Sequence, residues 1–143
     1  MDIEIILEAL GGSLELQGSP DQSKGYGGLC LRGAPLFTHA VMTTDKGPLA
    51  KDATNAAFCW ADLSTPDLGI AIFVSPSHPD FPTAWLIRNS YAGVLNPSWP
   101  GLKSVVLHPG SPVKLGYRLY IHHGDVNTGR VATAYDHYVR GQE

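Results

Sequence analysis

The chain has 143 residues, of which 43% are hydrophobic and 16% charged, a composition typical of one folded domain and not of a disordered segment. The formal net charge is −3 and the ten Lys and Arg residues form no cluster, so no nucleic-acid-binding groove is expected. No apolar stretch is long enough to span a membrane and the N-terminus is acidic where a signal peptide is basic, so we expect a cytoplasmic protein without membrane contact.

Sixteen Gly and eleven Pro residues separate short apolar runs, as is typical of all-β proteins. Alternating apolar and polar residues predict strands at 13–17, 28–32, 39–44, 57–63, 69–74, 83–88, 104–107 and 114–123, and residues 3–10 form either a strand or a short helix. The run 69–74 is apolar throughout, which predicts a central strand that is covered on both faces. The proline-rich stretches 75–82 and 96–101 are predicted to be stiff loops.

The hydrophobic period changes after Gly124. Apolar and aromatic residues then recur at helical spacing, which predicts a helix at about 126–140, capped by Asp125 or Asn127. About eight short strands followed by one helix predict an all-β fold, an antiparallel β-sandwich with one C-terminal α-helix, as a single domain over residues 1–143. The helix is expected to pack across a sheet face or an edge.

Metal-binding and cofactor-binding motifs are not recognisable in the sequence. Cys30 and Cys59 lack Cys-x-x-Cys spacing, and both a reduced pair and a single disulfide are compatible with the sequence. The six histidines include no pair at ligand spacing, and the adjacent His122 and His123 point to opposite faces of a strand. The glycine-rich segment 24–28 lacks the spacing of a phosphate-binding loop and is interpreted as a tight turn. We therefore expect no cofactor and no metal.

The predicted strand 114–123 carries the most distinctive polar pattern. Arg118, Tyr120 and His122 share one face, while the other face is mostly apolar. Arginine supplies a fork of donors, tyrosine a stacking surface, and histidine can transfer a proton near neutral pH. This face is a candidate binding surface for a polyhydroxylated or anionic ligand, and the alternative is an ordinary solvated face.

The two proline-rich loops contain further candidates. His78 lies near Asp80 on a stiff loop and could act as an acid or base if the carboxylate orients it, although Asp80 also suits a plain turn. Trp99 could stack on a sugar ring, or it could close over the edge of the core.

Arginines on two other strands are candidate neighbours of this site. Trp85 and Arg88 fall on opposite faces of one strand, and Trp85 is expected in the core. Arg88 is too costly to bury unpaired, so it should reach solvent, a carboxylate or a ligand. Arg32, on an earlier predicted strand, is included as a possible ligand contact.

Four segments, with their residues and their order, resemble a bacterial family of unknown function that is often labelled "methane oxygenase PmoA". They are residues 24–32, 60–64, 69–88 and 115–122. The similarity runs from about Ser13 to Tyr138. The resemblance implies a sandwich like the supersandwich of aldose epimerases, and a link to sugar metabolism. It does not imply a methane oxygenase subunit, since this chain cannot span a bilayer.

The chain departs from the family pattern in two respects. Relatives are usually longer at the N-terminus, so the chain resembles the C-terminal half of the pattern, a half-length sandwich. Many relatives carry Trp-His-x-Arg where this chain reads Trp85-Leu86-Ile87-Arg88, and Leu86 would remove any chemistry that depends on that histidine. A half-length sandwich leaves strands without partners, so we expect a homodimer that completes the sheets across a two-fold axis.

These observations lead to the hypothesis of a protein that binds or acts on a carbohydrate at one sheet face. The candidate catalytic residues are His122 and His78, and the candidate substrate-binding residues are Arg118, Tyr120, Arg88, Arg32 and Trp99. An enzyme of this kind would perform an epimerase- or lyase-like proton transfer. The alternative is a non-catalytic, dimeric interaction protein derived from a longer sugar-handling enzyme.

Overall fold

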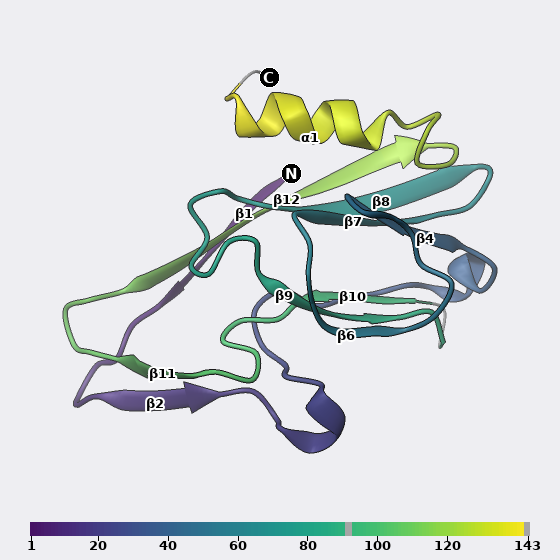
Figure 1. Cartoon of the computed structure of the whole chain (residues 1–143). Coiled ribbons are helices and arrows are strands. Elements are labelled where there is room, and N and C mark those ends of the chain that lie inside the picture. The colour runs from purple at the N-terminus through teal and green to yellow at the C-terminus, as the bar shows by residue number, and fades with distance from the viewer. Residues whose placement is uncertain (91–92, 142–143) are drawn as a thin grey trace.

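The computed structural model describes residues 1–90 and 93–141, which form three antiparallel sheets and one α-helix (Figure 1). A six-stranded sheet has the order β1-β12-β8-β7-β4-β5, a four-stranded sheet the order β3-β10-β9-β6, and β11 pairs with β2. The first two sheets face each other, and the helix lies on the far side of the six-stranded sheet (Figure 1). The predicted all-β sandwich with one C-terminal helix is therefore confirmed.

The strands are β1 (Asp2–Leu7), β2 (Leu14–Gln17), β3 (Leu31–Arg32), β4 (Val41–Thr44), β5 (Gly47–Pro48), β6 (Ala53–Ala57), β7 (Trp60–Ser64), β8 (Leu68–Val74), β9 (Ala84–Arg88), β10 (Val94–Pro97), β11 (Ser104–Leu107) and β12 (Val113–His123). Two short 3-10 helices, η1 (Asp21–Ser23) and η2 (Pro35–Phe37), precede α1 (Val131–Val139). No helix in the described part of the chain is long and apolar enough to cross a membrane.

The main core lies between the six-stranded and the four-stranded sheet. Trp85 and Ile87 of β9 belong to the same buried cluster as Ile72 and Val74 of β8 and Tyr117 of β12. The core position expected for Trp85 is confirmed, and its indole N–H donates to the carbonyl of Phe58 at 2.8 Å. Burying each large apolar side chain of this kind stabilises the fold by roughly 1.5–3 kcal/mol.

A second cluster lies between the six-stranded sheet and α1. The ring of Phe73 is 5.5 Å from Tyr120, 5.4 Å from Tyr135 and 5.9 Å from Tyr138 between ring centroids. Phe73 and Ala71 face the helix, whereas Ile72 and Val74 face the main core. This double burial explains why β8 is apolar throughout, as the sequence predicted for a central strand.

The helix is shorter than predicted and begins at Val131 rather than near residue 126. The segment before it forms hydrogen-bonded turns, in which Asp125 Oδ1 accepts from the backbone N–H of Asn127 at 3.1 Å and of Thr128 at 2.8 Å. The residue before the helix, Arg130, has φ 50° and makes no side-chain cap. Asp125 therefore stabilises the preceding turn and does not cap the helix.

The prediction of one strand at residues 57–63 is wrong, because the chain changes sheets in the middle of this segment. The backbone N–H of Phe58 donates to Thr83 beside the four-stranded sheet at 3.3 Å, and the carbonyl of Cys59 accepts from Val74 in the six-stranded sheet at 3.0 Å. Phe58 consequently belongs to the main core, whereas Trp60 belongs to the cluster beneath α1.

The prediction for residues 96–101 is also partly wrong, because β10 includes Asn96 and Pro97. Pro97 is the last residue of β10, where a strand tolerates the loss of an N–H donor. The strand predicted at 28–32 is reduced to Leu31–Arg32. Cys30 and Cys59 are both free thiols.

Because Phe73 packs against Tyr120 of the sheet and against Tyr135 and Tyr138 of α1, we predict that Phe73→Ala lowers the free energy of unfolding by about 3–5 kcal/mol. Val139→Ala, which changes an exposed residue at the end of α1, is the matched control and should change it little. Urea denaturation followed by circular dichroism measures both. A loss below about 1 kcal/mol for Phe73→Ala would show that the helix contributes little to the fold.

Candidate functional site

A cationic pocket lies on the outer face of the four-stranded sheet. Val94 of β10 pairs with Arg32 of β3 on one side and with Arg88 of β9 on the other, so the three residues form one row across the sheet. Lys24 and Tyr26, which follow η1, border the same cavity of about 250 Å³. The two arginines are distant in the sequence, and only the strand register brings them together.

Strand alternation explains why these side chains point outward. Trp85 and Ile87 of β9 are buried in the main core, so Leu86 and Arg88 lie on the opposite face of the strand. Arg88 and Trp85 thus lie on opposite faces of β9, as the sequence predicted. Leu86, the position at which the resemblance places a histidine in relatives, lines this same pocket.

The lining residues of the cationic pocket are Lys24, Tyr26, Arg32, Leu86, Arg88 and Val94. They include three cations and neither a carboxylate nor a histidine. Outside this lining, Asp52 lies 3.6 Å from Arg88 Nη1 and accepts from the backbone N–H of Asn89 at 2.8 Å. Because a guanidinium has five donors, this one ion pair orients Arg88 and leaves further donors for a ligand.

The segment that carries Lys24 and Tyr26 is held at both ends. Before it, the N–H of Gly18 donates to Gly101 at 2.8 Å; after it, Asn96 Nδ2 donates to the carbonyls of Gly27 at 2.8 Å and Leu29 at 2.7 Å. Directly before Lys24, Gln22 and Ser23 have φ values of 56° and 53°, which are uncommon for residues with a side chain. Strained backbone of this kind is often found at ligand sites.

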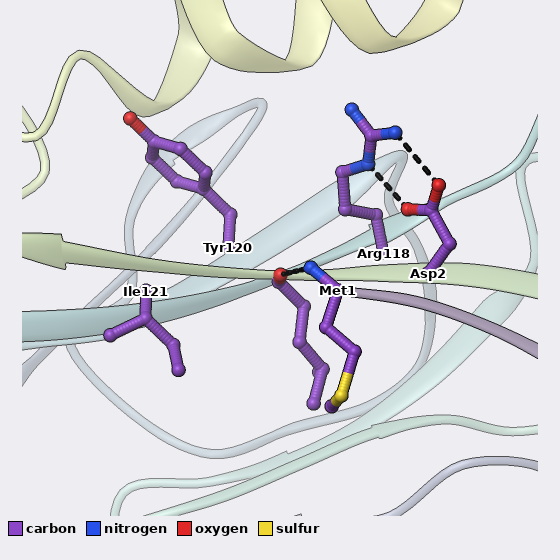
Figure 2. Close-up of a pocket in the computed structure, with 6 residues that line it drawn as sticks. Met1, Asp2, Arg118, Tyr120 and Ile121 are labelled. Carbon is purple, nitrogen blue, oxygen red and sulfur yellow. Dashed lines mark hydrogen bonds and ion pairs between the residues drawn. The ribbon is translucent and has the colours of Figure 1, made fainter. Parts of the chain in front are cut away.

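The row of Arg118, Tyr120 and His122 shares one face of β12, as predicted, and α1 and the turns before it pack over that face (Figure 1). The cover is incomplete, because Arg118 and Tyr120 still line a cavity of about 420 Å³ beside the N-terminus (Figure 2). Arg118 Nε and Nη2 donate to the carboxylate of Asp2 at 2.5 and 2.8 Å, and its guanidinium lies 4.6 Å from the ring centroid of Tyr138. Figure 2 shows Arg118 and Tyr120 pointing toward the helix. The Tyr120 hydroxyl donates to the carbonyl of Gly129 at 3.0 Å.

His122 is buried in a network with Asp62 and Ser64. Its Nε2 is 2.8 Å from Asp62 Oδ1, and the Ser64 hydroxyl donates to Asp62 Oδ2 at 2.6 Å. Gly129 packs so closely that a Cβ there would lie 2.1 Å from His122 Nδ1. Burial raises the pKa of Asp62. Because the hydroxyl is bonded to the carboxylate and not to the imidazole, the three residues do not form a nucleophilic Ser-His-Asp triad.

His78 is buried beside Tyr117 in the interior. Its Nδ1 is 2.6 Å from the carbonyl of Pro79, which only accepts, so Nδ1 carries the proton and Nε2 accepts from the Tyr117 hydroxyl at 2.9 Å. Burial lowers the pKa of His78 and raises that of Tyr117 to about 12. Asp80 does not contact His78 through a hydrogen bond and instead pairs with Lys103 at 2.9 Å.

The predicted site residues therefore occupy three separate places. Arg32 and Arg88 meet in the cationic pocket, while Arg118, Tyr120 and His122 lie beneath α1 and its preceding turns. His78 and Trp99 are in the interior; Trp99 is 3% exposed, and its indole N–H has no hydrogen-bond partner among the described residues. Lys24 and Tyr26 were not predicted as site residues. Their alternation with glycines at 24–28 could have indicated a binding segment, because it places a cation and an aromatic ring on a tight turn.

Comparison with known proteins gives a family but no characterised relative. A family model described as a family of unknown function (DUF6807) matches residues 1–136. No curated protein and no solved structure matches the chain. The label "PmoA" and the relation to aldose epimerases stay predictions.

The lowered pKa of His78 predicts a pH dependence of stability. Since the folded state disfavours protonation, this contribution is fully present above the unfolded pKa of about 6.5 and is lost as the pH falls below it toward the folded pKa. We expect the free energy of unfolding to decrease between pH 7 and pH 5, and His78→Gln to make this decrease smaller. His39→Gln, at an exposed histidine, is the control for urea denaturation across this range. Equal slopes in all three proteins would contradict the assignment.

Proposed function

We propose that this chain, which belongs to the DUF6807 family of unknown function, is a binding protein for an acidic carbohydrate on the outer face of its four-stranded sheet. The observation that carries the proposal is the row of Arg32, Val94 and Arg88, with Lys24 beside it in one pocket.

The row favours an anionic group as the ligand. Arg32 and Arg88 are two strand spacings apart, roughly 10 Å between backbones, and the small Val94 between them leaves room for both side chains to converge. Guanidinium groups bind carboxylates and phosphates with two parallel hydrogen bonds, and an ammonium such as that of Lys24 adds charge without a fixed geometry. A single acid group between the two arginines satisfies this arrangement.

The remaining surface favours a polyhydroxylated body for that ligand. The side chain of Tyr26 is 41% exposed and offers an aromatic surface for a sugar ring. Thr54 pairs with Leu86 across β6 and β9, so its exposed hydroxyl lies on the same face as the pocket. With a net charge of −3, the protein as a whole does not attract a long polyanion such as nucleic acid.

Binding is favoured over catalysis because the lining of the pocket contains no group suited to acid–base chemistry at neutral pH. His78 and His122 both lie elsewhere, and each uses its Nε2 in a hydrogen bond within the protein. A catalytic role for either histidine remains a prediction that the proposed function does not need.

The proposal is tested by titration calorimetry with galacturonate and, as a neutral ligand of the same shape, galactose. We expect saturable binding of galacturonate and weaker or no binding of galactose. Arg32→Gln and Arg88→Gln should each weaken galacturonate binding by about tenfold or more, because a charge-assisted hydrogen bond contributes about 1.5–3 kcal/mol. Arg140→Gln removes the same charge from an exposed position after α1 and should leave affinity unchanged. Absence of saturable binding, or equal affinity for galactose, would contradict the proposal.

An open sheet edge supports a second candidate function, that of a dimeric interaction protein. β1 pairs with Val113–Arg118 of β12, and the N–H groups of Met1 and Leu119 donate to each other's carbonyls at 2.8 and 2.9 Å. Beyond this pair, no strand within residues 1–90 and 93–141 pairs with this side of β12. Ile121 is 71% exposed beside this edge and points away from the helix (Figure 2). Such an edge can pair with that of a second copy about a two-fold axis.

This candidate predicts a homodimer in solution. Light scattering should give twice the mass of the chain, and Ile121→Lys should shift the protein toward the monomer by placing like charges at the interface. Val106→Lys, at an exposed residue of β11, is the matched control and should remain dimeric. A wild-type protein that is monomeric at all concentrations would exclude this candidate. Thermal shift with a panel of sugars separates the two functions, since a ligand of the folded state raises Tm.

A further inference from the structure

We infer that the ligand is an acidic oligosaccharide rather than a single sugar, because a second pocket lies further along β9 on the same face as the cationic pocket. The second pocket has a volume of about 170 Å³, and its lining includes Asn55, Asp80, Ala84, Ser98, Leu102 and Lys103. This inference rests on the proposed function and adds the length of the ligand to it.

Residues of β9 line both pockets, and because Leu86 between Arg88 and Ala84 is only 1% exposed, a ligand in both pockets would pass over the residues that cover Leu86. Leu86 and Arg88 line the cationic pocket and Ala84 lines the second pocket, while the intervening Trp85 and Ile87 are buried in the core. All three outward residues therefore lie on one face, and the span from Arg88 to Ala84 is roughly 13 Å at strand geometry. This length exceeds one sugar ring and suits about two or three linked rings.

The walls of the two pockets also touch. Gly25, between Lys24 and Tyr26, packs against the loop that borders the second pocket, and a Cβ at Gly25 would lie 3.0 Å from the backbone nitrogen of Leu102. Its φ of 54° and this close approach both require glycine. The segment that carries Lys24 and Tyr26 is thus joined directly to the wall of the second pocket.

The chemistry of the second pocket differs from that of the first and suits the uncharged part of a sugar chain. Lys103 and Asp80 pair at 2.9 Å with both side chains exposed, so their charges offset each other while each can still contact a ligand. Asn55 adds an exposed amide, which both donates and accepts. Sugar hydroxyls also both donate and accept, so they match this mixed lining.

Backbone strain gathers around the two pockets. Five non-glycine residues in residues 1–90 and 93–141 have positive φ; Asn55 (φ 54°) and Asp80 (φ 60°) line the second pocket, and Gln22 and Ser23 precede Lys24 at the first. Asn55 is the extra residue of a bulge in β6, where the register shifts between Thr54 and Ala56. Bulges commonly redirect side chains at binding sites.

A sugar chain fits this surface better than an extended peptide does. Peptides that dock as strands pair with the open edge of a sheet. Here both pockets lie over β9, whose backbone is already paired with β6 on one side and β10 on the other. A peptide on this face would find no free strand edge.

The experiment compares galacturonate with a trimer in which one galacturonate ring is linked to two uncharged galactose rings, by titration calorimetry on the full chain. We expect the trimer to bind at least about tenfold more tightly, the gain from one or two added hydrogen bonds. Lys103→Ala and Ala84→Gln, which respectively remove a contact from the second pocket and fill it, should reduce trimer affinity to that of the monomer. Neither variant should change monomer affinity, which also verifies that both fold.

The outcomes separate this inference from the function on which it rests. If galacturonate binds with dependence on Arg88 but the trimer binds no more tightly, the inference is overturned while the proposed function stands. If neither acidic sugar binds, both are overturned. Tighter binding of a tri-glutamate peptide than of the trimer would overturn the carbohydrate class, and unchanged trimer affinity in both Lys103→Ala and Ala84→Gln would exclude the second pocket.

Discussion

The arrangement of the molecule depends on the burial of β8 on both of its faces. Ile72 and Val74 face the core between the sheets, and Ala71 and Phe73 face the opposite side. A strand of this composition is stable only if both faces are removed from water. The four-stranded sheet covers one face, so α1 must cover the other (Figure 1).

The position of α1 decides which polar residues are available to a ligand. On the helix-facing side of β12, His122 becomes buried and Arg118 and Tyr120 become partly buried, and polar groups that lose water need partners within the protein. Asp62 pairs with His122 and Ser64, and Arg118 pairs with Asp2. These contacts connect β7, β12 and β1 beneath the helix.

The face of the sandwich that α1 leaves uncovered carries the candidate site. Arg32 and Arg88 reach solvent there, so their charges remain hydrated, and Asp52 orients one of them at the rim. The two pockets on this face follow from ordinary strand alternation on β9, with a β-bulge and a strained turn at their borders. A regular sheet thus supplies a rigid floor, and irregular backbone at its margins supplies the binding groups.

The sequence by itself determined the class of fold, the position of most strands, the double burial of β8 and the opposite orientation of Trp85 and Arg88. These properties follow from hydrophobic periodicity, which is a local signal. It did not determine that the chain changes sheets at Phe58, that α1 covers the row containing His122, or that Arg32 meets Arg88. A period of two tells which side of a strand a residue occupies, whereas the neighbouring strand, its register and the cover of each face depend on contacts between distant segments, and only the tertiary structure decided them.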